Sequence, residues 1–196
     1  MDILYHDKDL AVCLKPVGLD AEKQVPEALK SALGGEIYTV HRLDLNVGGV
    51  MIYARTKPAA AALSRAISEG TMIKEYAAMV HGTPPERGDW EELLFKDSAR
   101  NKVFVVSRMR AGVRRARLEY ERMTDGDPSL VFIRLHTGRS HQIRVQFASR
   151  GFPLLGDHKY GARDAFTAPR LFSRRITFPY RGKTLSFEAL PDWAKP

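Results

Sequence analysis

The stretch Tyr38-Thr-Val-His41-Arg42-Leu43-Asp44-Leu-Asn-Val-Gly48-Gly49-Val-Met-Ile-Tyr53-Ala54-Arg55 organises the chain. Its apolar block, residues 50–54, has the length of a short buried strand and follows two glycines that let the backbone turn. The polar loop before this block holds one carboxylate, Asp44, beside an arginine and a histidine. A carboxylate held between two strands beside a fixed cation stays ionised even where water is partly excluded. Asp44 is therefore a candidate nucleophile or base, although an aspartate in a turn rich in asparagine and glycine is commonly only a turn former.

The chain is basic, with a formal net charge of +8 and a pI near 9.7. A basic balance favours a polyanion as partner, and nucleic acid is the commonest one; the alternative is a merely soluble basic surface. The arginines are clustered, which favours the first interpretation. They form two groups, which are Arg108, Arg110, Arg114, Arg115 and Arg117, and then Arg170, Arg174, Arg175 and Arg181.

The length predicts a single domain spanning residues 1–196, because such a chain can bury one good hydrophobic core. Charged residues interrupt the first ten positions, so no signal peptide is expected, and no run of about eighteen apolar residues indicates a membrane span. The single cysteine, Cys13, excludes an intramolecular disulfide and fits a reducing compartment. We therefore expect a cytoplasmic protein.

Hydrophobic periodicity predicts an α+β fold with a mixed, mostly antiparallel sheet. Helices are predicted over residues 26–33, 57–69 and 141–150, the last capped by Ser140. Strands are predicted over residues 3–5, 10–14, 50–54, 71–80, 102–106, 116–123, 130–135, 176–179 and 184–190. The polar segment 84–100 is predicted to be a loop, and the arginines between residues 106 and 116 are predicted to form a hairpin turn.

Two motifs carry a resemblance to a known family. His41-Arg42-Leu43-Asp44, followed by a glycine-containing turn and an apolar strand, resembles the nucleophile motif of the RluA family of pseudouridine synthases. The segment Leu135-His-Thr137-Gly138-Arg139-Ser-His141-Gln142-Ile143-Arg144, with Gly151-Phe-Pro153-Leu-Leu-Gly156-Asp157-His-Lys-Tyr160-Gly161 after it, resembles that family's other long signature. Lys15-Pro16-Val17-Gly18 and the Lys-x-Tyr of Tyr76 also match family motifs.

The resemblance covers nearly the whole chain and implies the pseudouridine synthase catalytic fold, in which helices and loops flank a long bent sheet. It leaves no room for a separate amino-terminal RNA-binding domain. The implied activity is isomerisation of uridine to pseudouridine in structured RNA, either ribosomal or transfer RNA. No cofactor is implied, and we expect a monomer that acts on RNA without a membrane or a metal ion.

The resemblance also implies roles for individual residues. Asp44 is the catalytic carboxylate, and Arg144 orients it and favours its charged form. Tyr76 stacks over the base, although from the residues alone a strand tyrosine is usually half-buried packing. We therefore expect an Arg144 nitrogen within about 3 Å of an Asp44 oxygen.

RNA contacts are predicted at six positions, which are His41, Arg42, Arg114, Arg115, Arg117 and Arg139. Arg42, beside the nucleophile loop, is the candidate to fill the gap left by a flipped uridine, and its alternative role is a structural ion pair. The next pair along the second signature, His141 and Gln142, is expected to fix loop geometry by hydrogen bonding.

The sequence departs from the family pattern at two places. Val47-Gly48-Gly49 stands where the family commonly has Thr-Ser-Gly, which removes two hydroxyls near the nucleophile. Gln146 stands where the second signature often continues with histidine. These changes bear on loop rigidity and substrate detail more than on reaction type, because Asp44, Tyr76 and Arg144 are all present.

Two other classes of function stay open. One is an RNA-binding module that kept the fold and lost catalysis. The other is a hydrolase that pairs Asp44 or Asp157 with a histidine such as His158. Zinc and nucleotide sites are not supported, because the spacing of histidines, the lone cysteine and the glycines matches neither a zinc-ligand pattern nor a phosphate-binding loop.

Overall fold

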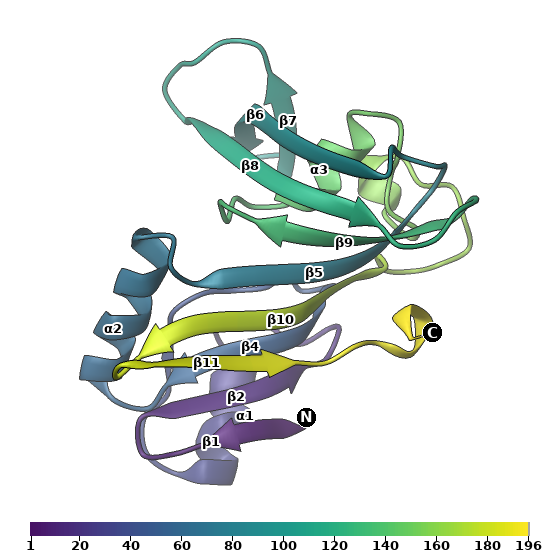
Figure 1. The fold of residues 1–196 in the computed structure, drawn as a ribbon. Coiled ribbons are helices and arrows are strands. Elements are labelled where there is room, and N and C mark those ends of the chain that lie inside the picture. The colour runs from purple at the N-terminus through teal and green to yellow at the C-terminus, as the bar shows by residue number, and fades with distance from the viewer. Residues whose placement is uncertain (196) are drawn as a thin grey trace. The chain divides into compact units, whose positions relative to one another are not determined.

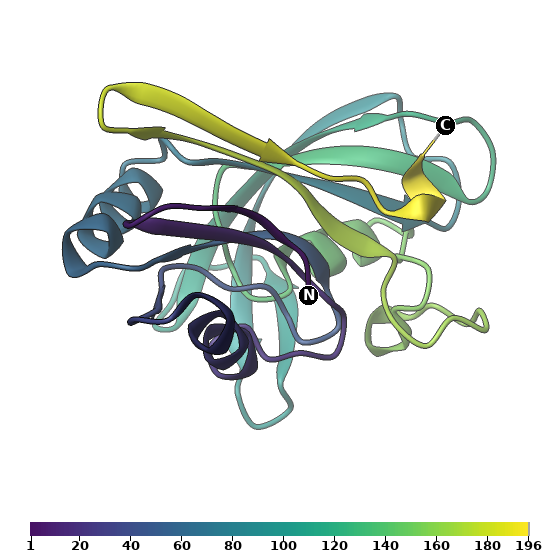
Figure 2. The same ribbon diagram turned by 90° about the horizontal axis from the view of Figure 1, so that it is seen from below.

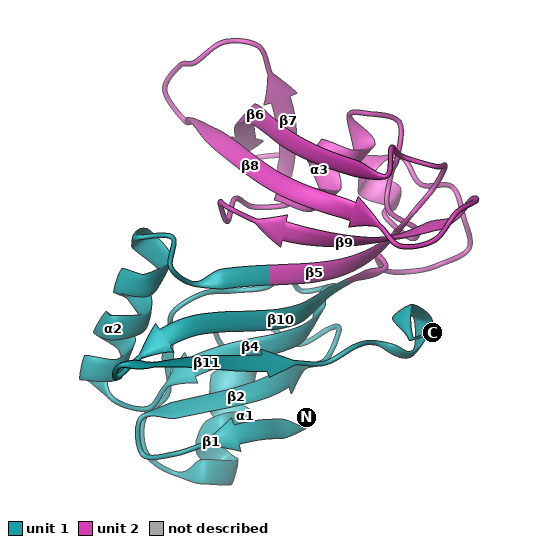
Figure 3. Cartoon of the chain, in the orientation of Figure 1, with its two compact units in different colours: residues 1–74, 172–196 teal, residues 75–171 magenta. Residues whose placement is uncertain are grey.

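The computed structural model describes residues 1–195. The chain divides into two compact units, which Figure 3 draws in different colours. Unit 1 comprises residues 1–74 and 172–196, and unit 2 comprises residues 75–171. The first unit is therefore built from both ends of the chain, and the second is one continuous segment.

Unit 1 is built on a mixed sheet with the strand order β1-β2-β4-β10 (Figure 1). Parallel pairing occurs where β10 meets β4, whereas β1, β2, β3 and β11 pair antiparallel with their neighbours. The β10–β11 hairpin is the yellow ribbon of Figure 2. The strands of this unit are β1 (Ile3–His6), β2 (Leu10–Lys15), β3 (Tyr38–Thr39), β4 (Gly48–Ala54), β10 (Leu171–Tyr180) and β11 (Lys183–Glu188).

The core of unit 1 lies between these strands and helix α2 (Lys57–Ser68). Thr56 begins this helix by accepting a hydrogen bond from the amide of Ala59, and Pro58 fits its first turn. Helix α1 (Gln24–Leu33) and the short 3-10 turn η2 (Asp192–Ala194) complete the unit. The buried core cluster is Leu10, Val12, Val50, Ile52, Ala54, Ala59, Leu63, Ala66, Met72, Ile176 and Phe178.

Unit 2 has the strand order β5-β9-β8-β6-β7, with β5 entering it from unit 1. Its pairs β6–β7, β6–β8 and β8–β9 are antiparallel, which agrees with the predicted fold class. Its elements are β5 (Ile73–Val80), β6 (Arg87–Asp97), β7 (Lys102–Val106), β8 (Val113–Arg122), β9 (Ser129–Leu135), helix α3 (Gln142–Ala148) and the 3-10 turn η1 (His158–Tyr160).

Strand β6 corrects the prediction of a loop over residues 84–100. Eleven residues of that segment form a strand that pairs with both β7 and β8. Arg87, Asp89 and Glu91 share one face, where Asp89 and Glu91 bond to Arg117 and Arg115 of β8. On the other face, Trp90 packs against aromatic rings. Asp89 and Glu91 are thus accommodated in a strand because the neighbouring strand supplies their counter-charges.

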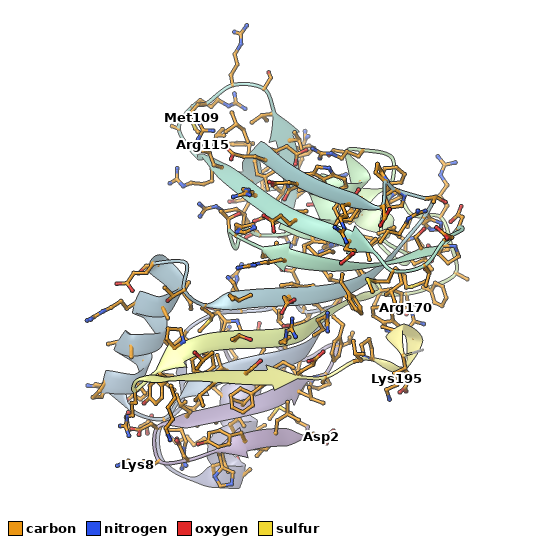
Figure 4. All side chains as sticks on the ribbon, in the orientation of Figure 1. Asp2, Lys8, Met109, Arg115, Arg170 and Lys195 are labelled. Atoms are coloured by element: carbon orange, nitrogen blue, oxygen red, sulfur yellow. The ribbon has the colours of Figure 1, made fainter. Side chains whose placement is uncertain are left out.

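Two further element boundaries differ from the prediction. Strand β8 begins at Val113, so Arg114 and Arg115 lie on a strand rather than in a hairpin turn, whereas Arg117 lies on a strand as predicted; Figure 4 labels Arg115 and, in the turn, Met109. Helix α3 begins at Gln142 without a capping bond from Ser140, because His141 takes a left-handed conformation with φ of 51°. The loop before α3 is held by other side chains, described below.

Candidate active site

The Asp44 loop joins β3 to β4 within unit 1. Asp44 is half-buried, and its carbonyl accepts a hydrogen bond from the amide of Val47 at 3.0 Å, which closes a tight turn. Strand β4 starts directly after this turn and is buried along its whole length. A rigid strand therefore fixes the end of the loop that carries the carboxylate.

A buried lysine ties the Asp44 loop to β2. The ammonium of Lys15, whose residue is only 1% exposed, donates to the carbonyls of Pro16, Leu45 and Val47 at 3.0, 3.2 and 2.8 Å. These three bonds match the three hydrogens of an ammonium group. Burial lowers the pKa of Lys15 to about 8, and attraction to Asp44 acts in the opposite direction. Lys15 is thus a fixed cation near Asp44 within this unit.

A glycine allows the closest approach between β4 and β10. Gly49 has φ of 125°, and a Cβ atom there would lie 2.4 Å from the carbonyl oxygen of Ser173. The hydroxyl of Ser173 donates to the carbonyl of Val50 at 2.9 Å, which locks the two strands together. Only glycine satisfies both the backbone angle and the contact.

His41 and Arg42 precede Asp44 and have different surroundings. The imidazole of His41 accepts a hydrogen bond from the amide of Ile52 at 3.2 Å, and burial lowers its pKa to about 3. A neutral ring that accepts a bond from β4 stabilises the loop. Arg42 is exposed and forms an ion pair with Glu22 at 3.1 Å, with both side chains about half exposed. The predicted RNA contacts of these two residues stay predictions.

Arg144 is held in unit 2 by a buried carboxylate. Its Nε and Nη2 atoms each donate to an oxygen of Asp157 at 2.7 Å, and both side chains are almost fully buried. The guanidinium also lies over the ring of Tyr160, at 5.1 Å from the ring centroid. This combination of a bidentate ion pair and a stacked ring fixes the plane of the guanidinium.

Tyr160 contacts both Arg144 and His141, the residue that precedes helix α3. Its hydroxyl accepts a hydrogen bond from the amide of Val103 at 2.9 Å and lies 2.8 Å from Nδ1 of His141. Nearby, the side-chain oxygen of Gln142 accepts bonds from the Thr137 hydroxyl and the Arg139 amide at 2.8 and 3.1 Å. These bonds confirm the prediction that His141 and Gln142 fix the geometry of this loop.

The predicted RNA-binding arginines of unit 2 already have protein partners. Arg117 forms a bidentate pair with Asp89 at 2.9 and 2.8 Å, and Arg115 pairs with Glu91 at 2.8 Å. Nε of Arg139 donates to the backbone carbonyl of Arg115 at 3.0 Å, and Arg114 donates to the carbonyl of Val113. A phosphate would therefore have to compete with carboxylates at Arg115 and Arg117.

The three predicted catalytic residues fall in different units. Asp44 belongs to unit 1, whereas Tyr76 and Arg144 belong to unit 2. Tyr76 is buried on β5, at 7% exposure. The expected bond between Asp44 and Arg144 stays a prediction.

The pair Asp157 and His158 has a structural arrangement, which gives a hydrolase no support. The carboxylate of Asp157 is bonded to Arg144. The two ring nitrogens of His158 face the backbone carbonyls of Ala162 and Phe166 at 3.1 and 2.7 Å, and these bonds raise its pKa. Neither side chain is arranged to activate the other.

Sequence reasoning did not assign Lys15, Asp157 or Tyr160 to the site. Lys15 was matched only as part of a turn motif, and Asp157 and Tyr160 only as members of a signature. The available signal was residue type, because a lysine that ends an apolar run, Leu10 to Leu14, has to satisfy its ammonium when it is buried.

Among residues 1–195, no helix is long and apolar enough to cross a membrane, and no group of three His, Cys, Asp or Glu side chains is placed to hold a metal ion.

Comparison with known families gives one match over most of the chain. A family model described as RNA pseudouridylate synthase matches residues 7–149. The dual-specificity RNA pseudouridine synthase RluA of Escherichia coli is 33% identical over 207 residues, covering 97% of this chain and 93% of that protein.

Longer relatives are matched over part of their length. The ribosomal large subunit pseudouridine synthase D of Zymomonas mobilis is 31% identical, and the chain spans 68% of it. The protein of the same name from Vibrio cholerae is 33% identical, and the chain spans 53% of it. Among solved structures, human RNA pseudouridylate synthase domain containing 4 has a TM-score of 0.83 at 24% identity, covering 98% of this chain and 89% of that one, which is a likeness of fold.

Proposed function

Because the chain belongs to the RNA pseudouridylate synthase family, we propose that it isomerises uridine to pseudouridine in structured RNA with Asp44 as the catalytic carboxylate. The observation that carries this assignment is the Lys15 ammonium, which holds the Asp44 loop through three backbone carbonyls. A carboxylate that has to act on a ribose or a base needs a fixed position and a charged form. Lys15 supports both, through its bonds to the loop and its positive charge.

The reaction breaks the bond between ribose and nitrogen 1 of uracil, turns the base and joins it again through carbon 5, which loses its proton while nitrogen 1 gains one. It consumes no reductant and no energy source. What it needs is an ionised carboxylate and a uracil that is held in the right position. In this proposal Asp44 acts on the ribose or the base, and Tyr76 stacks on the uracil.

Arg144 orients Asp44 in this proposal. A guanidinium has five N–H donors, and Asp157 accepts from two of them. Asp157 and Tyr160 together hold the guanidinium in one plane, which is the condition for presenting further donors at a fixed angle. Support for the role of Arg144 therefore comes from how firmly it is positioned.

We propose ribosomal or transfer RNA as the substrate, read in a folded region from which the uridine is flipped. The support is the names of relatives, of which one is a dual-specificity RNA pseudouridine synthase and two are ribosomal large subunit pseudouridine synthases. Flipping costs a few kcal/mol, which a side chain inserted into the gap offsets in part. Arg42 is the candidate because it is exposed, lies in the Asp44 loop and forms a surface ion pair with Glu22.

The test is the substitution Asp44→Asn, which keeps the size of the side chain and removes its charge. We expect RNA binding and the far-UV circular dichroism spectrum to be kept, and pseudouridine formation to fall at least about 1,000-fold because the carboxylate is lost. The matched control is Asp2→Asn, an exposed aspartate of the same unit, labelled in Figure 4.

Pseudouridine is mapped in RNA from cells with and without the protein, and then in the same RNA incubated with each variant. Near-normal conversion by Asp44→Asn would refute the role of Asp44. Tight binding by the wild-type protein with no pseudouridine in any RNA would favour the inactive RNA-binding module instead.

A further inference from the structure

We propose that the loop between η1 and β10 presents Phe166, backed by Arg170, as a stacking surface for an unpaired base of the substrate RNA. The ring of Phe166 is 40% exposed, and the guanidinium of Arg170 lies over it at 4.4 Å from the centroid. An exposed aromatic ring gains stabilisation when stacking removes its face from water, and a base is a flat partner of matching size. This proposal rests on the proposed function, because it assumes an RNA substrate.

The loop is rigid although it has no regular secondary structure. Asp164 accepts bonds from the amides of Gly156 and Phe166 and from the ring of His81, at 2.9, 2.9 and 2.7 Å. These bonds hold the pKa of Asp164 near 2 even though burial acts in the opposite direction. The carbonyl of Phe166 itself lies 2.7 Å from Nε2 of His158. The backbone on both sides of the ring is therefore fixed before any ligand arrives.

Backbone packing anchors the rest of the loop. Gly156 has φ of 76°, and a Cβ atom there would meet the carbonyl of Ala168 at 2.1 Å. The amide of Arg170 donates to the carbonyl of Leu155 at 2.8 Å, and its carbonyl accepts from the amide of Met79 at 3.0 Å. Such anchoring lowers the entropy lost on binding, because the loop does not have to be ordered by the RNA.

The charge around the ring suits a polyanion. Lys159 in η1 and Arg163 in the loop are exposed, and Arg170, which Figure 4 labels, is partly exposed. His158 faces two carbonyls, which favours the imidazolium because a charged ring can donate from both nitrogens. The loop's carboxylate, Asp164, is occupied by internal bonds. An aromatic ring among cations is the arrangement that binds single-stranded nucleic acid, whose bases stack while its phosphates are attracted.

The test compares two RNAs of equal length, a hairpin with an unpaired loop that contains uridine and a fully paired duplex. Stacking on one base predicts that Phe166→Ala weakens hairpin binding by about 5- to 100-fold and duplex binding by less than about 2-fold. Phe166→Trp should bind the hairpin within about 3-fold of wild type, and Phe166→Leu, which keeps apolar area without a ring, should behave like alanine. The matched control is Met123→Ala, another exposed apolar residue of unit 2 at 45% exposure, which should change neither affinity.

Three results would overturn the proposal. They are hairpin binding by Phe166→Ala equal to wild type, an equal loss on hairpin and duplex, or full binding by Phe166→Leu. Far-UV circular dichroism of each variant checks the fold, and the exposed tryptophan variant keeps the test valid if alanine disturbs the loop. A failure of the proposed function is recognised separately, because it leaves the wild-type protein unable to form pseudouridine whatever these affinities are.

Discussion

At the scale of single residues, the site depends on two buried charges that hold functional groups in place. The ammonium of Lys15 fixes the loop of Asp44, and the carboxylate of Asp157 fixes the guanidinium of Arg144. Taking either charge out of water is costly, and the cost is offset only because each one is fully bonded. Both residues should therefore be sensitive to changes that keep their shape and remove their charge.

Lys15→Met tests the first of these charges. Methionine has a similar length but cannot donate to the carbonyls of Pro16, Leu45 and Val47. We expect the free energy of unfolding to fall by about 1–3 kcal/mol, the cost of leaving buried acceptors unpaired. Urea unfolding at pH 7 measures it, with Lys8→Met as the control at an exposed lysine (labelled in Figure 4).

The pH dependence of the same variant follows from the lowered pKa. Lys15 titrates near 8 in the folded protein and near 10.5 in the unfolded chain. Between these values the unfolded chain holds more protons, so Lys15 makes the free energy of unfolding rise with pH. Wild type should therefore gain stability over Lys15→Met between pH 8 and pH 10.5, in unfolding curves measured at each pH. A constant difference across this window would mean that Lys15 is not buried as a charged group.

Sequence patterns predict the structural role of a residue when its partners lie near it along the chain. The Asp44 loop was predictable because the glycines and the apolar block that define it are contiguous. The pairing of Arg144 with Asp157 was not predictable, because thirteen residues and an irregular loop separate them. Lys15 looked like part of a turn, since nothing in the sequence tells that its ammonium reaches carbonyls thirty residues away.

At the scale of elements, β6 and β8 form a ladder of paired charges. Arg87 pairs with Glu121, Arg117 with Asp89, and Arg115 with Glu91. The sequence of β6 alone looks like a polar loop, because charged residues are depleted in strands. Only the register with β8 shows that Asp89 and Glu91 have partners, so this strand could not be predicted from local sequence.

This ladder predicts how RNA affinity responds to the loss of acids. Asp89→Asn combined with Glu91→Gln releases Arg115 from Glu91 and leaves Arg117 paired with Glu119 alone. We expect RNA affinity to rise by about 3- to 10-fold, and the plot of log affinity against log salt to become steeper by about one to two counterions. Affinity measured over a series of salt concentrations gives both values.

The control for the ladder removes two acids elsewhere. Glu36→Gln with Asp192→Asn changes the net charge equally but breaks exposed pairs with lysines in unit 1. An equal gain in both double variants would mean that net charge, not this face, sets affinity.

Replacing Arg114, Arg115 and Arg117 by alanine should flatten the salt dependence of RNA affinity, because fewer counterions are then released on binding. An unchanged slope would remove these residues from the RNA surface.

At the scale of the whole molecule, the fold and family predicted from the motifs are confirmed by the family model and the solved structures. The single catalytic domain stays a prediction. Strand β5 runs from unit 1 into unit 2, and the chain returns from unit 2 to complete unit 1 through β10. Local periodicity shows neither the passage of β5 into unit 2 nor the return of the chain through β10, because both depend on pairing between distant strands.

We expect the two units to unfold in one cooperative transition, because β5 belongs to both of them. The chain offers a reporter in each unit, Trp90 in unit 2 and Trp193 in unit 1. In the single-tryptophan variants Trp193→Phe and Trp90→Phe, urea midpoints from fluorescence should coincide with those from far-UV circular dichroism. Separate midpoints in either variant would indicate two domains that fold independently.

The close approach at Gly49 also limits how this protein can diverge from its relatives. In the family pattern that the sequence resembles, Thr-Ser-Gly stands at the place of Val47-Gly48-Gly49, so the chain departs from that pattern at the first two positions and agrees at the third. A Cβ atom at position 48 would be only tight, at 3.1 Å from the carbonyl of Lys15, whereas at position 49 it would overlap the backbone of Ser173. Random mutation can therefore explore the first two positions for new substrate preferences, while every lineage that keeps β4 beside β10 must keep the third as glycine.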